Sequence, residues 1–448
     1  MMRRCMRPLV PVLLLALAAS ALFYACGASN VDAPPPQRSA EEVVRCRTFE
    51  ELMPRFSSAL STGKTEGLRQ VMVDHLLLPE DGREGEPPPM AQVLRTVFTT
   101  LGRFADEPPE PGAHDGELCA ATPPPLEDAH PLCETRRAMD LLVHEGKGLE
   151  ALGLLDPQIS GVLNYVRGTS PASRKENHYE VAQVISDLCR QTDRCKASDT
   201  ADLIVGLTAY LGTPEGRQGL DNALAMVTDS RFEPYLRGDG AAYGGEEAIV
   251  ALAKVLIDAV KGMAHPDDLD NLPLDIVPED IRPLLQGGIA DLKVLLDPAR
   301  EPNVFRPLKR ALNCLKETDA NQELIRMVYR LGLEARLPEF GFTRLLETAK
   351  GLRDTDERGT LLHLTSRFAR AVKQDEDGLR AIAHVCKTMF STEAPPGQTH
   401  SPAELAVPVL ADLFEDGVAA EALCAADTLV YGCAGGGQPA CALAESAR

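Results

Sequence analysis

Ile281–Leu296, with the sequence IRPLLQGGIADLKVLL, is the stretch that decides the fold class. Its large aliphatic residues recur three or four places apart, at Ile281, Leu284, Leu285, Ile289, Leu292 and Leu296. Such spacing gathers them on one face of a helix with 3.6 residues per turn, whereas a strand would alternate every second residue. The stretch therefore predicts an amphipathic helix that packs by one face against others.

The same spacing returns along most of the chain. Further apolar stripes lie at residues 90–101, 181–188, 249–260, 308–315, 324–331 and 379–389, and strand-like alternation is almost absent. Most breaks between stripes are short, so neighbouring helices are expected to pack antiparallel as hairpins. Two longer breaks, 79–89 and 106–131, are rich in proline and acidic residues and are predicted to be exposed loops. The predicted fold is all-α: a multi-helix antiparallel array, either α-solenoid-like or a compact helical bundle, with disulfides.

Several breaks carry residues typical of helix starts. Thr213 is followed by proline at the first helical position, and Ser401 is followed by Glu404 in a capping-box pattern. Asp319 with Gln322, and Asp354 with Glu357, suggest two further starts. These pairs predict where individual helices begin.

The paired-helix rhythm resembles that of HEAT and armadillo-like helical-repeat proteins in a general way. The letters LLDP at 154–157 recur at 295–298, which would fit a duplicated half. Chance similarity between leucine-rich helices is the stronger explanation, because the match lapses soon after. No diagnostic repeat motif is present, so solenoid and bundle both stay open.

The N-terminus has the three parts of an export signal. Residues 1–25 combine Arg3, Arg4 and Arg7 with an apolar run that is too short for a membrane span. Phe23-Tyr24-Ala25-Cys26 resembles the lipobox of bacterial lipoproteins, although phenylalanine replaces the usual leucine. The resemblance implies removal of 1–25, lipidation of Cys26 and a stable membrane anchor. Gly27 in place of aspartate implies the outer membrane of a Gram-negative envelope. The alternative is an ordinary secretory signal cut after Ala21 or Ala25.

Composition divides the remainder into a tether and a helical body. Residues 26–38 contain Pro34-Pro35-Pro36 and read as an extended tether. The body is predicted as an N-terminal helical domain, 39–237, and a C-terminal one, 246–448, with the glycine-rich RGDGAAYGG at 237–245 between them. One continuous helical domain is the alternative.

Ten cysteines remain after Cys5 of the signal and Cys26 are set aside, and an even number in an exported protein indicates disulfides. Short loops favour the pairs Cys119–Cys133, Cys189–Cys195 and Cys433–Cys441. The partners of Cys46, Cys314, Cys386 and Cys424 are left unassigned. Zinc is excluded as an interpretation because no CxxC pair occurs.

Motifs for catalysis, metals and nucleic acids were sought without success. SALSTGKT at 58–65 lacks the first glycine of a phosphate-binding loop, no GxSxG occurs, and His144-Glu145 lacks the second histidine of HExxH. The acidic clusters at 267–270 and 375–378 lack the full calcium-loop series, and caps or solvated turns explain them better. A net charge of −20 argues against nucleic acid. No cofactor, metal or catalytic residue is predicted.

Three functions from different classes follow from these observations. The leading one is a non-enzymatic envelope lipoprotein, anchored through Cys26, whose helical surface docks an envelope protein. A module that binds a small molecule or lipid between helices is the second. An enzyme with an unrecognised active site is the third.

Overall fold

A computed structural model describes residues 87–105, 107–114, 117–170, 197–238, 244–313, 319–334, 341–375 and 399–413, and shorter pieces between 77 and 430. Within these residues every regular element is a helix, which confirms the all-α prediction. In chain order they are α4 (Pro89–Ala105), η1 (Leu126–Asp128), α5 (Pro131–Met139), η2, a π-helical turn (Asp140–His144), α6 (Lys147–Val166), α8 (Ala197–Leu211), α9 (Pro214–Val227), α10 (Phe232–Arg237), α11 (Glu246–Gly262), η4 (Pro266–Asn271), η5 (Leu274–Ile276), α12 (Arg282–Leu295), α13 (Phe305–Asn313), α14 (Asp319–Glu334), α15 (Gly341–Thr355), α16 (Thr360–Lys373) and α18 (Pro402–Leu413).

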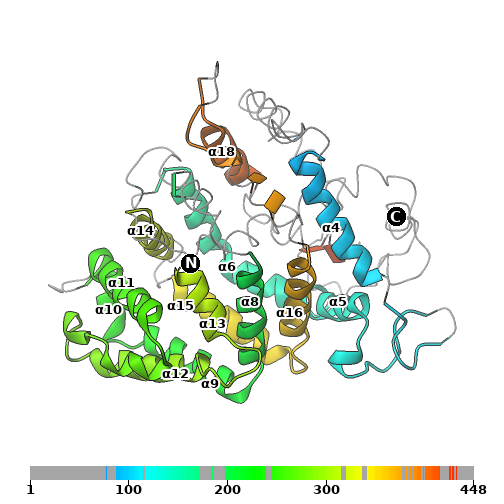
Figure 1. The fold of residues 1–448 in the computed structure, drawn as a ribbon, viewed down its shortest axis with the longest axis horizontal. Coiled ribbons are helices and arrows are strands. Elements are labelled where there is room, and N and C mark those ends of the chain that lie inside the picture. The colour runs from blue at the N-terminus through cyan, green and yellow to red at the C-terminus, as the bar shows by residue number, and fades with distance from the viewer. Residues whose placement is uncertain are drawn as a thin grey trace.

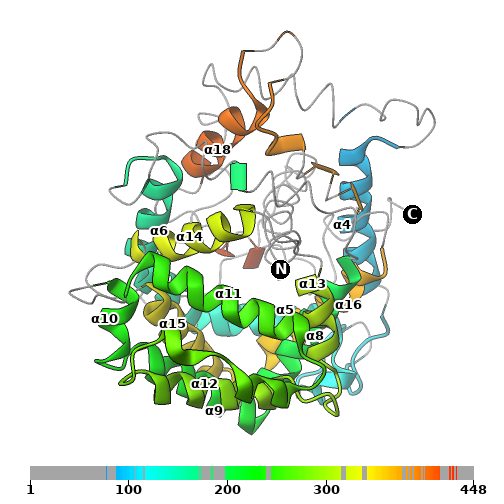
Figure 2. The same ribbon diagram turned by 60° about the vertical axis from the view of Figure 1, so that its left-hand side comes forward.

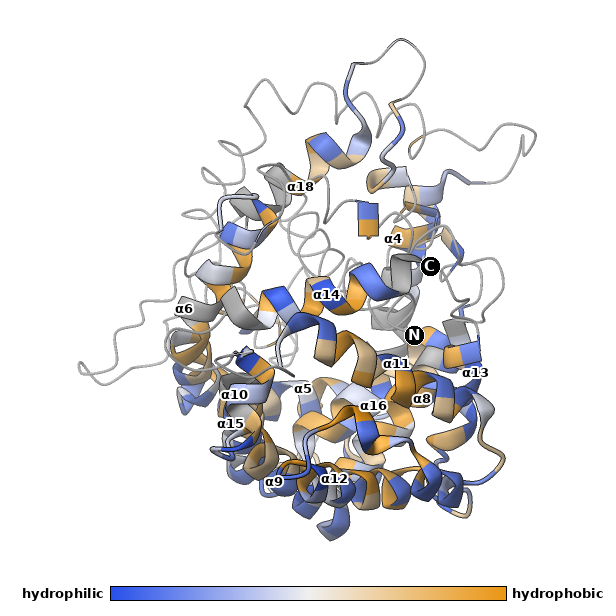
Figure 3. Ribbon diagram, turned by 90° about the vertical axis from the view of Figure 1, so that its left-hand side faces the viewer, coloured by the Kyte–Doolittle hydropathy of each residue, from blue (hydrophilic) through white to orange (hydrophobic). Residues whose placement is uncertain are grey.

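Helices distant in sequence pack side by side. α8 packs along α16 and also against α13, and α6 contacts both α14 and α15. α9 and α12 lie together at one edge of the molecule in both ribbon views (Figures 1 and 2). Figure 3 shows hydrophilic residues along the outer side of that edge, as expected for helices that bury only one face.

The stretch 281–296 forms helix α12 with one turn residue at each end, as its periodicity predicts. Ile281, Leu285 and Ile289 are buried, and Leu296 is 0% exposed. Leu296 packs in a core cluster with Leu203 of α8 and Phe305 of α13. Ile281 and Leu285 belong to a second cluster, which the side chains of α10, α11 and α14 complete. One amphipathic helix therefore joins two parts of the core.

The glycine-rich stretch 237–245 separates helices that share a core. Phe232 and Tyr235 precede it and pack with Leu252 and Tyr329, which follow it. The backbone also closes on itself here, because the Gly245 N–H donates to the Tyr235 carbonyl at 2.8 Å. Gly238 and Gly245 both have positive φ, and a Cβ on Gly238 would lie 3.0 Å from the Gly245 Cα. Glycine at 238 and 245 therefore lets the two ends of this stretch approach closely.

Two of the predicted helix starts are confirmed in detail. The Thr213 hydroxyl accepts from the Gly216 N–H at 3.1 Å at the start of α9. At the start of α18, Ser401 and Glu404 exchange side-chain to backbone bonds of 3.3 and 2.8 Å, a capping box. α14 begins at Asp319, as expected.

The predicted start at Asp354 is wrong, because α15 continues to Thr355. Asp356 takes over the role for α16: its carboxylate oxygens accept from the N–H groups of Thr360 and Leu361, at 2.9 and 2.7 Å. Two aspartates lie within one turn of each other, and sequence pattern alone does not choose between them.

The two LLDP copies adopt different structures. Leu155, which corresponds to Leu296, lies inside α6, which runs through Pro157, and it is partly exposed. Leu296 follows the end of α12 and is fully buried, with Pro298 in the next turn. The shared letters thus do not mark one repeated local structure. None of the described helices is both long enough and apolar enough to span a membrane.

Candidate functional site

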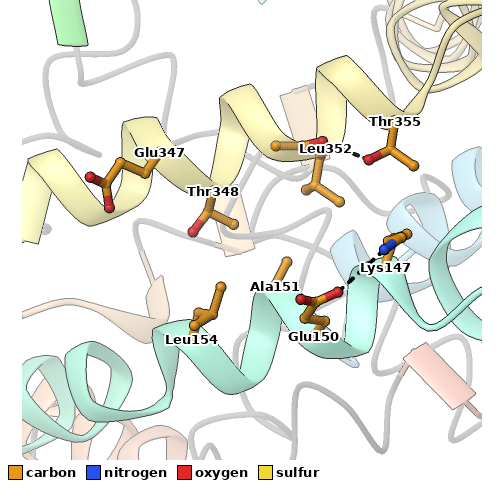
Figure 4. A pocket seen from close by; sticks show the side chains of 9 residues that line it. Lys147, Glu150, Ala151, Leu154, Glu347, Thr348, Leu352 and Thr355 are labelled. Atoms are coloured by element: carbon orange, nitrogen blue, oxygen red, sulfur yellow. Dashed lines mark hydrogen bonds and ion pairs between the residues drawn. The ribbon is translucent and has the colours of Figure 1, made fainter. Parts of the chain in front are cut away.

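A groove of about 230 Å³ lies between α6 and α15. Ala151 and Leu154 on α6 face Thr348 and Leu352 on α15 across it (Figure 4). The groove is lined by Lys147, Glu150, Ala151, Leu154, Glu347, Thr348, Gly351, Leu352 and Thr355. Residues distant in sequence thus form one concave surface.

The α6 wall is set by the turn that precedes it. Gly146 follows the π-helical turn by two residues, and its φ of 78° lets α6 start in a new direction at Lys147. Residues spaced three or four apart then line the groove, from Lys147 through Glu150 and Ala151 to Leu154. Lys147 and Glu150 form an exposed ion pair of 3.6 Å at one end. Leu154 is half exposed, so this wall presents an apolar side chain to solvent.

The α15 wall repeats the helical spacing. Its lining residues are Glu347 and Thr348, then Gly351 and Leu352, then Thr355. A Cβ added to Gly351 would meet no atom within 4 Å, so the missing side chain leaves open space in the groove. The Thr348 hydroxyl oxygen is buried, and it has no hydrogen-bond partner in the described part of the chain.

Ion pairs on its other side fix α15 to α9. Lys350 and Arg353 both contact the Asp221 carboxylate, at 3.0 and 3.2 Å. The hydrogen bond from Lys350, followed by the bond and charge of Arg353, keeps the pKa of Asp221 below its usual value. Arg353 also donates to the Arg217 carbonyl at 3.0 Å. The α15 wall is therefore held in place independently of any ligand.

The chemistry of the lining fits binding better than catalysis. Its nine residues include two glutamates and a lysine but no histidine, cysteine or aspartate. Acid–base or nucleophilic catalysis needs paired groups that activate one another. The groove offers instead an apolar centre with charges at its margins.

A second polar arrangement joins α5 to α16 around Glu134. Its carboxylate is 0% exposed and lies 2.5 Å from the His363 Nδ1 and 3.4 Å from an Arg367 nitrogen. Arg367 also contacts Glu107 at 2.5 Å and donates to the Ala129 carbonyl at 2.6 Å. Burial raises the pKa of Glu134, against the pull of His363 and Arg367. This network ties helix and loop together.

The predicted disulfide Cys119–Cys133 is present, with a Cα–Cα distance of 5.5 Å. It fastens loop 107–131 to α5. Close by, Arg137 forms a two-pronged ion pair of 2.6 and 2.7 Å with Glu110, and Glu110 also accepts from the Ala120 N–H. Cys424 is disulfide-bonded too. Cys26, Cys189, Cys195, Cys433 and Cys441 lie outside the described residues, so their predicted roles stay predictions.

The prediction of 106–131 as an exposed loop is correct for only part of its length. Its polar tips are exposed, but Glu110, Ala129 and His130 are 2–3% exposed. Arg358, in the turn before α16, donates to the Pro124 carbonyl, and Arg367 of α16 donates to the Ala129 carbonyl. A buried carboxylate and a disulfide draw the loop inward despite its polar composition.

The acidic cluster at 267–270 acts as a cap and in ion pairs. Asp268 accepts from the N–H groups of Ala264 and His265 at 2.7 and 3.0 Å. Lys293 lies 2.9 Å from Asp267 and 2.7 Å from Asp270. In the second cluster, Asp375 accepts from the Thr96 hydroxyl at 2.7 Å. Over the described residues, no group of three His, Cys, Asp or Glu side chains is placed to hold a metal.

His144 pairs with an acid from the far end of the chain. Its Nε2 lies 3.0 Å from the Asp427 Oδ1, and Asp427 is 6% exposed. Cys424, one turn earlier, packs with Val143 and Leu149. The sequence suggests His144 only as part of a peptidase motif, and no local pattern points to its contact with Asp427.

The groove was also missed, since nothing in the sequence links Leu154 with Gly351. Comparison of the chain with models of known protein families, with curated proteins and with solved structures gives no match.

Proposed function

We propose that the protein is a non-enzymatic lipoprotein of the bacterial envelope that docks another protein in the α6–α15 groove. The N-terminal signal and the lipobox-like Phe23–Cys26 support the anchor, at the outer membrane. The disulfide between Cys119 and Cys133 fits an oxidising compartment. The groove supports the docking role.

The observation that carries the proposal is the exposure of Leu154 inside a concave surface. Leu154 is a large aliphatic side chain that is 50% exposed beside Ala151 and Leu352. When a partner covers it, the free energy of the complex is lowered. Gly351 leaves the space that an incoming side chain would fill. Single exposed apolar residues are common on protein surfaces, so the concavity is what distinguishes this one.

The occupant we infer is one helix of a partner protein that presents an aliphatic side chain next to a lysine or arginine. Glu150 and Glu347 provide carboxylates at the margins of the groove. The full chain carries a net charge of −20, or −23 once the three arginines of the signal are removed, and so attracts cationic partners. A groove of about 230 Å³ is smaller than most small-molecule sites, which favours a protein side chain over a free ligand.

Site-specific photo-crosslinking tests the docking role directly. A photoreactive amino acid at Leu154 should capture one partner in intact cells, through a helical segment with a basic residue near the crosslink. Val294 on α12, which is 41% exposed, provides the matched control. Capture of the same protein from both positions, or from neither, would contradict the proposal.

A blocking variant adds an independent test. Gly351→Leu fills the open space in the groove, whereas Gly287→Leu places the same side chain on α12, where a Cβ also meets no atom within 4 Å. Both changes improve helix propensity, so neither should harm folding. We expect at least tenfold weaker partner recovery with Gly351→Leu alone, and reduced recovery with Cys26→Ala, which lacks the lipid site.

A further inference from the structure

His130 joins loop 107–131 to the start of α5. Its ring is 2% exposed, and its Nδ1 accepts from the Leu132 N–H at 3.2 Å as the N-cap of that helix. The other nitrogen, Nε2, lies 3.2 Å from the Glu107 carbonyl oxygen. A backbone amide can only donate, so Nδ1 carries no proton, and Nε2–H donates to Glu107. Both nitrogens of the neutral ring are thus used.

A protonated ring does not fit this arrangement. A proton on Nδ1 would face the Leu132 N–H and add positive charge at the N-terminus of α5, where the helix dipole is already positive. Burial is the largest influence and lowers the pKa of His130 below 6.5, and the charge of Arg367 acts in the same direction. The bond to Glu107 and the charges of Glu107 and Glu110 oppose this shift.

We propose that His130 is an acid-sensitive latch, whose protonation breaks the cap on α5 and releases loop 107–131 from α5 and α16. The neutral ring holds the loop through Glu107, and Glu107 in turn binds Arg367 of α16. The disulfide between Cys119 and Cys133 keeps the released loop attached at its middle. Release is therefore a local opening of the loop.

The direction of the pH effect follows from the linkage between proton binding and loop release. A histidine with a lowered pKa in the closed state binds fewer protons there than when released, so closure is favoured above pH 6.5 and weakens as the pH falls below it. Glu110, whose pKa is lowered by Arg137 and by bonds to the loop against the effect of burial, also favours release on acidification. Glu134 opposes release between pH 4.5 and its raised pKa, since its buried carboxyl takes up a proton more readily in the closed state. Of these three groups, His130 is therefore the one whose protonation affects loop release nearest to neutral pH.

Hydrogen exchange of the full chain tests the latch. Protection of peptides from 107–131, divided by the intrinsic exchange rate at each pH, is compared at pH 7.5 and 5.5. One linked proton makes release up to about tenfold more favourable one unit below a pKa of 6.5, so wild-type protection should fall by more than twofold and up to about tenfold. His130→Asn keeps a neutral cap acceptor, and its protection should change less than twofold.

His265→Asn is the matched control, because His265 also caps a helical turn through Nδ1 but its side chain is 58% exposed. This variant should behave as the wild type does. Equal loss of protection in wild type and His130→Asn, or none in wild type, overturns the latch. If His130→Asn does not fold, carbon NMR of the wild-type histidines decides: the latch requires the Nε2–H tautomer at pH 7.5, and a ring pKa of 6.5 or above for His130 overturns it.

Discussion

At the scale of single residues, Glu134 shows how a buried charge is kept. Its carboxylate is wholly removed from solvent, yet His363 and Arg367 approach it and are themselves only partly exposed. Burying a carboxylate is unfavourable unless such partners compensate. The network is therefore sensitive to the loss of any one member.

We expect Glu134→Gln to lower the free energy of unfolding by about 1–3 kcal/mol, since the amide fills the same space but leaves Arg367 without its counter-charge and weakens the contact with His363. Urea denaturation at pH 7 measures this. Glu323→Gln is the control, because Glu323 is in an ion pair of 3.0 Å with Arg326 but its side chain is 37% exposed. Its effect should stay within about 0.5 kcal/mol. Equal losses in the two variants would contradict the conclusion that the buried carboxylate of Glu134 contributes more to stability than the exposed one of Glu323.

The glycines differ in how much space surrounds them. A Cβ on Gly216 would lie 1.9 Å from the Tyr210 carbonyl oxygen. Neither atom can move away without a shift of the backbone. We expect Gly216→Ala to destabilise the protein by more than about 2 kcal/mol. Gly287→Ala meets no atom and should stabilise α12 by roughly 0.5–1 kcal/mol. Thermal unfolding of both variants gives the two signs, and a stabilising Gly216→Ala would show that this turn rearranges freely.

At the scale of elements, the disulfide makes loop 107–131 part of the folded body. Its sequence separation is 14 residues, for which loss of the crosslink is expected to cost about 3 kcal/mol. The variants Cys119→Ala, Cys133→Ala and the double variant should all lose a similar amount, because either change removes the same bond. Urea denaturation of the three tests this. Additive losses would mean that each side chain contributes by packing alone.

The sequence predicts the helices and their caps better than it predicts the tertiary contacts between them. The stripes and the caps at Thr213 and Ser401 depend on neighbours within one or two turns, so a local pattern is enough. The predicted helix start at Asp354 lies two residues before the aspartate that caps α16, because Asp354 and Asp356 satisfy the same local pattern. Composition predicts an exposed loop over 106–131, whereas parts of it are held against the body by Arg358 and Arg367, which come much later in the chain.

The groove could not be predicted for the same reason. Leu154 and Gly351 become neighbours only because α6 and α15 pack together, and α15 is fixed to α9 through Asp221. In sequence, Leu154 is one leucine of a leucine-rich helical segment, and Gly351 is a weak helix residue. Tertiary packing decided which apolar residue stays outside.

At the scale of the whole molecule, helices from both predicted domains build the same core clusters. Leu203 of α8 is 3% exposed and packs with Val260, Ile289 and Leu312, all from the second half. α8 also packs along α16, and Lys373 of α16 contacts Asp202 at 2.5 Å. α6 is covered in part by α14 and α15. Either half alone would expose these surfaces.

This packing yields a prediction about folding. A fragment of residues 39–237 would leave Leu203 and the rest of the α8 face uncovered, and we expect it to show no cooperative thermal transition by circular dichroism. The fragment 246–448 should behave in the same way, while the whole body, 39–448, unfolds in one transition. Co-expression of the two fragments is the control, because they should associate and restore the transition if they share a core. A fragment that unfolds cooperatively by itself would instead establish 237–245 as a domain boundary.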